Sequence, residues 1–256
     1  CMKRKLIFVI NVDWFFISHR LPIALEASKD YEVHIATGIT NHREELEGYG
    51  FTVHSLKISR GSSGIFSSFR NLIEIYKIFN IVKPDIAHLV TIKPVLLGGI
   101  AAWLARVNCV VSSVSGMGYV FIKKGVFTIL IRIVVSFLYR LAFGHKHLRV
   151  IFHNKTDLEE VSKVANLLPK ESVLIKGSGV NLNEFQFSPI PQGKPIVVLA
   201  SRMLVDKGVK EFVEAASYLK KKGLKARFVL VGEPDTENNA SLSKKEIMAW
   251  KDRNII

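Results

Sequence analysis

Hydrophobic positions along the chain fall into two alternating patterns. Short continuous apolar runs are typical of strands buried on both faces of a parallel sheet, whereas apolar positions three and four residues apart are typical of helices. Strands are predicted at residues 6–11, 31–37, 51–56, 86–90, 109–114 and 149–153. Helices are predicted at residues 21–29, 42–48, 66–79, 94–105, 127–143 and 155–165. This alternation indicates an α/β fold with a doubly wound parallel sheet.

A second α/β unit is predicted after the proline-containing loop 188–193. Its elements are a strand at 195–200, a helix at 209–221, a strand at 226–231 and a helix near 244–250. One strand–helix–strand unit cannot cover both faces of a sheet, so the second domain is expected to be incomplete in this sequence. The predicted division is an N-terminal domain at 1–176, a linker at 177–193 and the beginning of the second domain at 194–256.

The fold class indicates where a ligand binds. Ligands of doubly wound sheets lie beyond the carboxyl ends of the strands. We therefore expect contacts from the loops after Asn11, Val90, Val114, His153 and Ile175.

The charge of the chain narrows the class of partner. Lys and Arg outnumber Asp and Glu by 36 to 22, so the formal net charge is +14 and the partners are expected to be anionic. Residues 86–156 contain no Asp or Glu but nine Lys or Arg residues, which marks one face for an anionic surface. The hydrophobic fraction of 48% excludes a disordered chain. The two cysteines, Cys1 and Cys109, exclude a disulfide framework and favour a reducing compartment.

Basic residues surround an apolar helix within residues 123–149. Arg132 and Arg140 interrupt its apolar stretch, so a membrane-spanning helix is not expected. Two interpretations stay open: a basic amphipathic helix that rests on an anionic membrane surface, and a core helix whose arginines reach solvent. Nucleic acid is not an expected partner, because aliphatic rather than stacking aromatic side chains separate the basic residues.

The segment 200–209 places two cations near the start of a helix. Arg202 follows a predicted strand, and Lys207 lies where the next helix begins, so free backbone N–H groups and the helix dipole add to their charge. Asp206 is predicted to cap that helix, and Gly208 lets a ligand approach the backbone. The segment is therefore either a diphosphate-binding loop or a loop with two solvated cations.

Three segments resemble signatures of the retaining glycosyltransferases of family 4. Residues 202–208 resemble the R-x(4)-KG motif, residues 177–185 the linker G-x-GV-[DN]-x-x-x-F, and residues 228–232 the strand and glycine loop beneath the nucleotide. The resemblance implies the B-type glycosyltransferase fold, in which two Rossmann-like domains hold a UDP-sugar in the cleft between them. The donor-binding residues that it implies are Arg202, Lys207, Gly177, Val180, Asn181 and Gly232.

No cofactor or metal is expected, since the sequence has no D-x-D motif and no spaced His/Cys cluster. Arg202 and Lys207 would instead neutralise the charge that builds on the departing diphosphate, which makes them the expected catalytic residues together with His88. His88 is expected at the end of a strand, where it would either share a proton near the acceptor hydroxyl or bond to the backbone. Val90 replaces a second His that many members of the family carry.

Segments 18–22, 88–94 and 115–121 resemble the branch of this family that builds bacterial surface polysaccharides on undecaprenyl diphosphate. This branch implies a lipid-diphosphate-linked glycan acceptor and a peripheral enzyme at the inner face of the cytoplasmic membrane. The residues expected to bind the acceptor are Asp13, His19, Arg20, Lys93, Gly116 and Gly118. His19 and Arg20 are expected to flank the first loop, where they meet an acceptor phosphate or cap the start of a helix, and Asp13 is expected in the same loop.

The sequence therefore predicts a retaining, metal-independent glycosyltransferase that moves an N-acetylhexosamine or hexose from a UDP-sugar. The alternative is a non-catalytic module that binds a membrane surface or a nucleotide-sugar. The paired-glutamate motif of the family, which holds the donor sugar and ribose, would lie beyond Ile256, so the sequence on its own is expected to be inactive or nearly so.

Overall fold

The computed structural model describes residues 3–58, 64–114, 116, 126–235 and 240–256, without the side chains of residues 65 and 126–132. The chain divides into two compact units, Cys1–Val180 and Asn181–Ile256.

The first unit is built on a seven-stranded sheet with the strand order β3-β2-β1-β4-β5-β6-β7. Every neighbouring pair is parallel. The strands are β1 (Arg4–Val12), β2 (Tyr31–Gly38), β3 (Thr52–Ser55), β4 (Ile86–Val90), β5 (Cys109–Val114), β6 (Leu148–Phe152) and β7 (Ser172–Leu174). The predicted α/β class and parallel sheet are confirmed.

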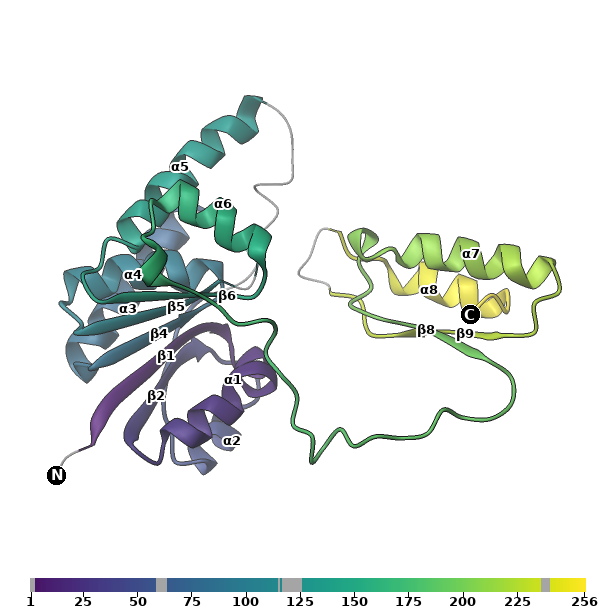
Figure 1. Ribbon diagram of the computed structural model, residues 1–256, viewed down its shortest axis with the longest axis horizontal. Helices are drawn as coiled ribbons and strands as arrows, with labels where there is room; N and C mark the ends of the chain where they lie inside the picture. Colours follow the sequence, from purple (N-terminus) through teal and green to yellow (C-terminus); the bar gives the residue numbers. More distant parts are fainter. Residues whose placement is uncertain (1–2, 59–63, 115, 117–125, 236–239) are drawn as a thin grey trace. The chain divides into compact units, whose positions relative to one another are not determined.

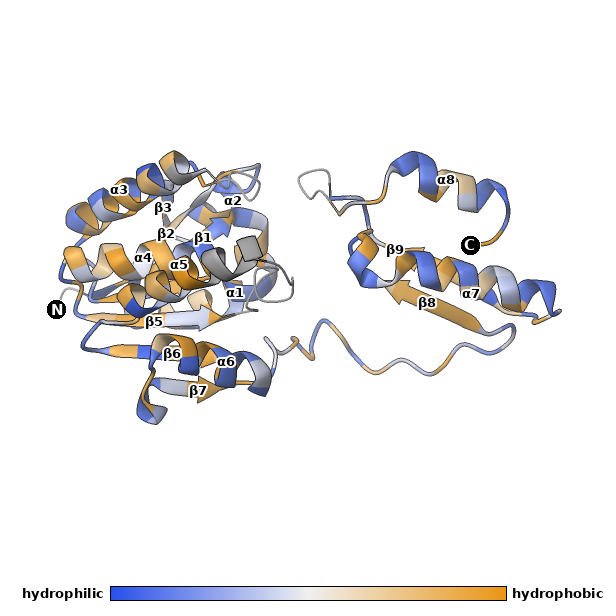
Figure 2. Cartoon of the chain, turned by 90° about the horizontal axis from the view of Figure 1, so that it is seen from above, coloured by the Kyte–Doolittle hydropathy of each residue, from blue (hydrophilic) through white to orange (hydrophobic). Residues whose placement is uncertain are grey.

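Helices cover this sheet from both sides (Figure 1). One face carries α1 (Asp13–Ala27) and α2 (Arg43–Gly48). The other face carries α3 (Ile65–Val82), α4 (Ile92–Leu104), α5 (Val126–Ala142) and α6 (Lys155–Ala165), and a 3₁₀ turn at Pro169–Glu171 precedes β7. Hydrophilic and hydrophobic residues alternate along α3, as expected for a helix with one face in the core (Figure 2).

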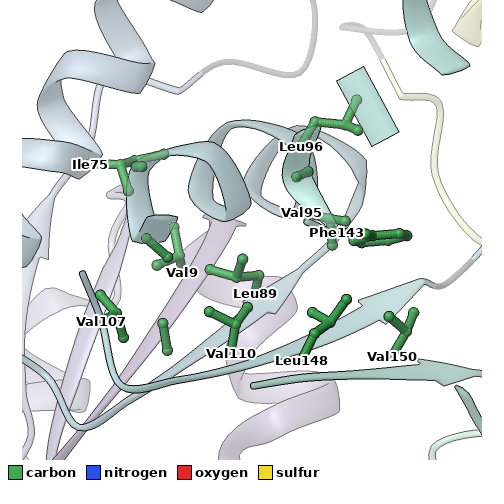
Figure 3. Packing of buried hydrophobic residues seen from close by; sticks show 14 of the residues in the cluster. Val9, Ile75, Leu89, Val95, Leu96, Val107, Val110, Phe143, Leu148 and Val150 are labelled. Atoms are coloured by element: carbon green, nitrogen blue, oxygen red, sulfur yellow. The ribbon is translucent and has the colours of Figure 1, made fainter. Parts of the chain in front are cut away.

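Two apolar cores hold the layers together. The larger core lies under α3, α4 and α5, where strand residues such as Val9, Leu89 and Val110 meet Ile75 of α3 and Phe143 beyond α5 (Figure 3). The smaller core lies under α1 and α2 and includes Phe8, Phe16 and Ile35. Helix α4 approaches α5 so closely that a Cβ at Gly99 would lie 2.6 Å from the Ala142 carbonyl oxygen, which explains the glycine there.

Helix α1 differs from its prediction. It begins at Asp13 directly after β1, so the predicted start at residue 21 is wrong and there is no loop after Asn11. Phe16, Arg20 and Ala24 are spaced by four residues and form the buried face of the helix, which holds the chain in helical form. Pro22 lies inside the helix, although proline is better tolerated in a first helical turn. Each of the other predicted strands and helices overlaps an observed element.

The second unit contains a two-stranded parallel sheet, β8 (Ile196–Ala200) and β9 (Arg227–Val231). Helices α7 (Val209–Lys221) and α8 (Lys244–Asp252) pack against it, and a 3₁₀ turn at Val205–Lys207 precedes α7. Strand β8 is hydrophobic along its length (Figure 2). Nevertheless Ile196, Val198 and Val231 are each about half exposed among the described residues (49%, 51% and 51%), so one face of this sheet is uncovered there.

Candidate functional site

The loop that follows β8 is clamped to the loop that follows β9. Ser201 N donates to Val231 O at 3.0 Å, and Met203 N donates to Glu233 O at 3.1 Å. Leu242 N in turn donates to Met203 O at 2.8 Å. The side chains of Met203 and its neighbour Leu204 are buried, so the backbone that carries Arg202 is fixed on both sides.

Arg202 lies in this clamped loop with a half-exposed side chain. Its Nη1 donates to Asp235 Oδ2 at 2.8 Å, and Asp235 comes from the loop after β9. A guanidinium has five N–H donors, and this contact uses one of them. Among the described residues Arg202 has no other side-chain acceptor, so the remaining donors are available to an anion.

Lys207 lies at the other end of the same loop, exposed at the last position of the 3₁₀ turn. Gly208 follows with φ of 73° and is the N-cap of α7. The predicted cap by Asp206 is wrong, because the N-cap is a glycine and no side chain caps the helix. The first turn of α7 therefore presents backbone N–H groups beside a lysine, an arrangement that favours anions.

Gly232 is required by the backbone of the clamp. Its φ is 139°, and a Cβ at this position would lie 1.9 Å from the Ser201 carbonyl oxygen. No other residue fits there without moving one of the two loops. This close packing explains why residue 232 is a glycine. The predicted contact of Gly232 with the donor stays a prediction.

The predicted linker residues Gly177, Val180 and Asn181 lie where the two units meet in sequence. All three are exposed, and Gly177 has φ of 73°. Asn181 forms a local turn, since its Nδ2 donates to Glu184 Oε1 at 2.8 Å and its backbone oxygen accepts from Phe185 N at 2.9 Å. Their role in donor binding stays a prediction.

Asp13 is fully buried as the first residue of α1, and not in a loop as predicted. Its Oδ1 accepts from Thr40 Oγ1 and Trp14 N, and its Oδ2 accepts from Thr40 N and His42 N, at 2.7 to 3.2 Å. Burial by itself would raise the pKa of Asp13, but these hydrogen bonds hold the pKa below its usual value of 3.8. Both oxygens are committed to the chain after β2, so Asp13 positions that segment.

His19 and Arg20 lie inside α1, so the prediction that they flank a loop or cap the start of a helix is wrong. His19 stacks on Phe15 with ring centroids 4.0 Å apart, and burial followed by the charge of Arg20 lowers its pKa. Arg20 is buried and donates to His19 O at 3.1 Å, while its Nε has no partner among the described residues. Burial also lowers the pKa of Arg20.

His88 lies in the middle of β4 and not at its end, in the layer under α1. Its Nε2 is 2.9 Å from Ser113 Oγ of β5, and its ring centroid is 5.0 Å from that of Phe8. The bond to a side chain corrects the expected bond to backbone. Burial, and secondly the charge of Arg20, lower the pKa of His88 to about 3, so the imidazole is neutral at physiological pH.

The direction of the connections changes between β1 and β4, because α1 and α4 leave these adjacent strands on opposite faces of the sheet. Ligands of such sheets bind at this point. Asn11 Oδ1 and Thr91 Oγ1 are buried here without a hydrogen-bond partner among the described residues, and Thr91 has φ of 73°. The side chains of Asn11 and Thr91 were not predicted as site residues, although ligand contacts were expected after the strands that end at residues 11 and 90.

Two further predicted acceptor residues, Lys93 and Gly116, lie at the same edge of the sheet. Lys93 is the second residue of α4, and partial burial lowers its pKa. Gly116 follows β5 with φ of 140°, and Gly118 lies outside the described residues. The geometry therefore gathers predicted and newly found polar groups at the carboxyl ends of β1, β4 and β5.

The described part of the chain contains no group of three or more His, Cys, Asp or Glu side chains that could hold a metal ion. No helix among the described residues is long and apolar enough to cross a membrane.

Residues 5–154 match the family described as glycosyl transferase 4-like, which is more than half of the chain. The chain belongs to this family, and the resemblance inferred from its motifs is confirmed.

Curated relatives narrow this membership. The N,N′-diacetylbacillosaminyl-diphospho-undecaprenol α-1,3-N-acetylgalactosaminyltransferase of Campylobacter jejuni is 31% identical over 91% of this chain and 66% of the relative. The UDP-Gal:α-D-GlcNAc-diphosphoundecaprenol α-1,3-galactosyltransferase of Escherichia coli is 26% identical over 75% of this chain and 51% of the relative. The chain thus spans less than two thirds of the length of these relatives.

A solved structure supports the fold alone. The sucrose-phosphate synthase of Thermosynechococcus elongatus superposes with a TM-score of 0.68 at 16% identity, over 99% of this chain and 68% of that one.

Proposed function

We propose that the chain is part of a retaining, metal-independent glycosyltransferase that moves an N-acetylhexosamine or hexose from a UDP-sugar to a lipid-diphosphate-linked glycan. The observation that carries this proposal is the clamped loop between β8 and α7, which presents Arg202 ahead of a 3₁₀ turn and Lys207 at the last position of that turn. Family membership supplies the reaction class, and this loop supplies groups that fit a diphosphate.

The donor end of the reaction follows from the charges in the loop. When the sugar leaves UDP, negative charge grows on the diphosphate, and fixed positive groups lower the energy of that state. A bidentate guanidinium, an ammonium and free N–H groups at a helix N-terminus all meet this need. They would replace the metal ion that some transferases use for the same purpose.

The acceptor end is supported by the names of two relatives, which both act on diphosphoundecaprenol-linked sugars. The predicted acceptor side of this chain contains the buried cation of Arg20 and the partly buried Lys93. It also contains Asn11 Oδ1 and Thr91 Oγ1, which have no hydrogen-bond partner among the described residues. A diphosphate and sugar hydroxyls are ligands that such groups bind.

His88 is proposed to act as a neutral hydrogen-bonding group near the transferred sugar. A pKa of about 3 makes it a weak base, so uptake of a proton near neutral pH is disfavoured. Its Nε2 already pairs with Ser113 Oγ, which fixes the orientation of the ring.

Docking on an anionic membrane surface through residues 123–149 is the second part of the proposal. Helix α5 projects beyond the other helices of its layer (Figure 1). One side of it exposes Ile133, Val134, Phe137 and Leu141, while Tyr139 and Ala142 on the opposite side are buried. Exposed apolar residues beside a segment without Asp or Glu fit an interfacial helix better than a core helix. We infer a peripheral place at the inner face of the cytoplasmic membrane, where a lipid-linked acceptor is in reach.

A transfer assay tests the proposal. The protein is incubated with UDP-N-acetylgalactosamine or UDP-galactose and an undecaprenyl-diphosphate-linked sugar, with and without EDTA. Mass spectrometry of the product counts the added sugars, and NMR gives the anomeric configuration of the new linkage. We expect one added sugar, α-linked, in a transfer that is insensitive to EDTA. Product that forms only with a divalent metal, or a β-linkage, would contradict the proposal.

A further inference from the structure

We propose that Asp235 is a positioning residue that aims the Arg202 guanidinium at the donor diphosphate. This inference rests on the proposed function, because it assigns a task to the same loop. No motif in the sequence drew attention to Asp235.

The geometry ties the carboxylate to the clamp that carries Arg202. Arg202 Nη1 and Asp235 Oδ2 are 2.8 Å apart. The backbone N of Asp235 donates to Ser241 Oγ at 2.9 Å, and Ser241 forms an antiparallel bridge with Leu204. Arg202 and Asp235 therefore lie on two segments that are hydrogen-bonded to each other, although 33 residues separate them in sequence.

The side chains of Arg202 and Asp235 differ in burial. This difference decides whether Asp235 keeps Arg202 when the diphosphate binds or competes with the diphosphate for it. The Arg202 side chain is 52% exposed, whereas that of Asp235 is 14% exposed. If a diphosphate pulled Arg202 away, it would break an ion pair to a mostly buried carboxylate, which is costly. A diphosphate that binds the outer donors of Arg202 avoids this cost, so the pair stays intact in the complex.

Holding Arg202 in one direction has a thermodynamic advantage. A free Arg side chain loses rotamer entropy when it binds a ligand, and a partner that has already fixed it removes part of that loss. The guanidinium fork keeps donors for two phosphate oxygens after one N–H has gone to Asp235. A carboxylate that merely competed with the ligand would have the opposite effect on affinity.

The test is a titration of UDP against the 256-residue chain and its variants by calorimetry. We expect Asp235→Ala to weaken UDP binding about tenfold. Asp235→Asn keeps an acceptor oxygen and should rescue binding to within about threefold of the unmodified chain. Glu233→Ala is the matched control, since it removes one negative charge two residues away without touching Arg202 and should not weaken binding.

Each outcome separates this inference from the function on which it rests. Tighter UDP binding by Asp235→Ala would overturn positioning in favour of competition, and so would an Asp235→Asn variant as weak as Asp235→Ala. Adding Asp235→Ala to Arg202→Ala should cost no further affinity, whereas an additive loss would mean that Asp235 affects UDP binding independently of Arg202 and would overturn positioning. If Arg202→Ala itself leaves UDP binding unchanged, or the unmodified chain binds no UDP, the phosphate-binding loop is wrong.

Discussion

The Ser201 carbonyl oxygen occupies the space that any side chain at Gly232 would need, 1.9 Å from where its Cβ would lie. Ser201 follows β8 and Gly232 follows β9, so this contact brings the ends of two adjacent strands together. The loop with Arg202 lies directly beyond Ser201. A backbone contact between two small residues therefore sets the position of the proposed diphosphate-binding cation.

Gly232→Ala should destabilise the second unit by about 3 kcal/mol or more, because the new Cβ meets a backbone oxygen and φ is 139°. Gly223→Ala is the matched control, since Gly223 also has a positive φ of 84° but has open space around it. That variant should lose only about 1 kcal/mol. Urea unfolding of both variants measures the difference, and equal losses would show that the Ser201 contact does not matter.

Asp13→Ala should lower the free energy of unfolding by about 3 kcal/mol at neutral pH, since it removes the four hydrogen bonds that this fully buried carboxylate accepts. The exposed Asp30 serves as control, and Asp30→Ala should have little effect. Because the folded pKa of Asp13 is lowered, its stabilisation is present above pH 3.8 and is lost as the pH falls below that value. The gap between Asp13→Ala and the unmodified chain should therefore narrow in acid, and a gap that widens there would contradict the assignment.

The neutral His88 should make stability depend on pH. Its folded pKa of about 3 lies below the ordinary value of 6.5, so the unfolded chain binds a proton that the folded chain refuses between these values. Stability is full above pH 6.5 and falls by about 1.4 kcal/mol per pH unit as the pH drops toward 3. Denaturant titrations between pH 4 and 6 should show a shallower slope for His88→Gln than for the control His147→Gln, which changes an exposed histidine. Identical slopes would mean that His88 is not buried in neutral form.

Phe137→Asp should weaken binding to vesicles of anionic phosphatidylglycerol about tenfold or more, the effect of removing one buried Phe from the interface. Phe69→Asp on α3 is the matched control, because the two side chains have similar exposure, 58% for Phe137 and 63% for Phe69. Co-sedimentation with vesicles measures both variants. Equal losses for the two, or none for Phe137→Asp, would place the membrane contact elsewhere.

Most of the fold could be predicted because buried parallel strands have continuous apolar runs. Strand 86–90 and helix 155–165 agree with β4 and α6 to the residue. The beginning of helix α1 could not be predicted, since the helix is held by the burial of Phe16 and Arg20 against the sheet. Such tertiary packing overrides local propensity.

The candidate site was less predictable than the fold. Arg202 and Lys207 were found because their spacing is local and typical of a family motif. Asp235 lies 33 residues from Arg202, and no periodicity relates them. Three other features also could not be predicted: Arg20 is buried, His88 is neutral, and Thr91 Oγ1 has no hydrogen-bond partner among the described residues. Each of them depends on the atoms that surround the side chain, and the sequence alone does not show which atoms these are.

Calorimetric titration of UDP with an Arg202→Ala, Lys207→Ala double variant tests the central claim most directly. Each lost charge-assisted contact is worth about 1.5–3 kcal/mol, so affinity should fall at least about 100-fold. The control is Lys221→Ala with Lys225→Ala, which removes the same charge at the far end of α7 and beyond, and should keep affinity within about threefold. An unchanged affinity in the Arg202, Lys207 variant, or an equal loss in both, would contradict the assignment of this loop to the donor diphosphate.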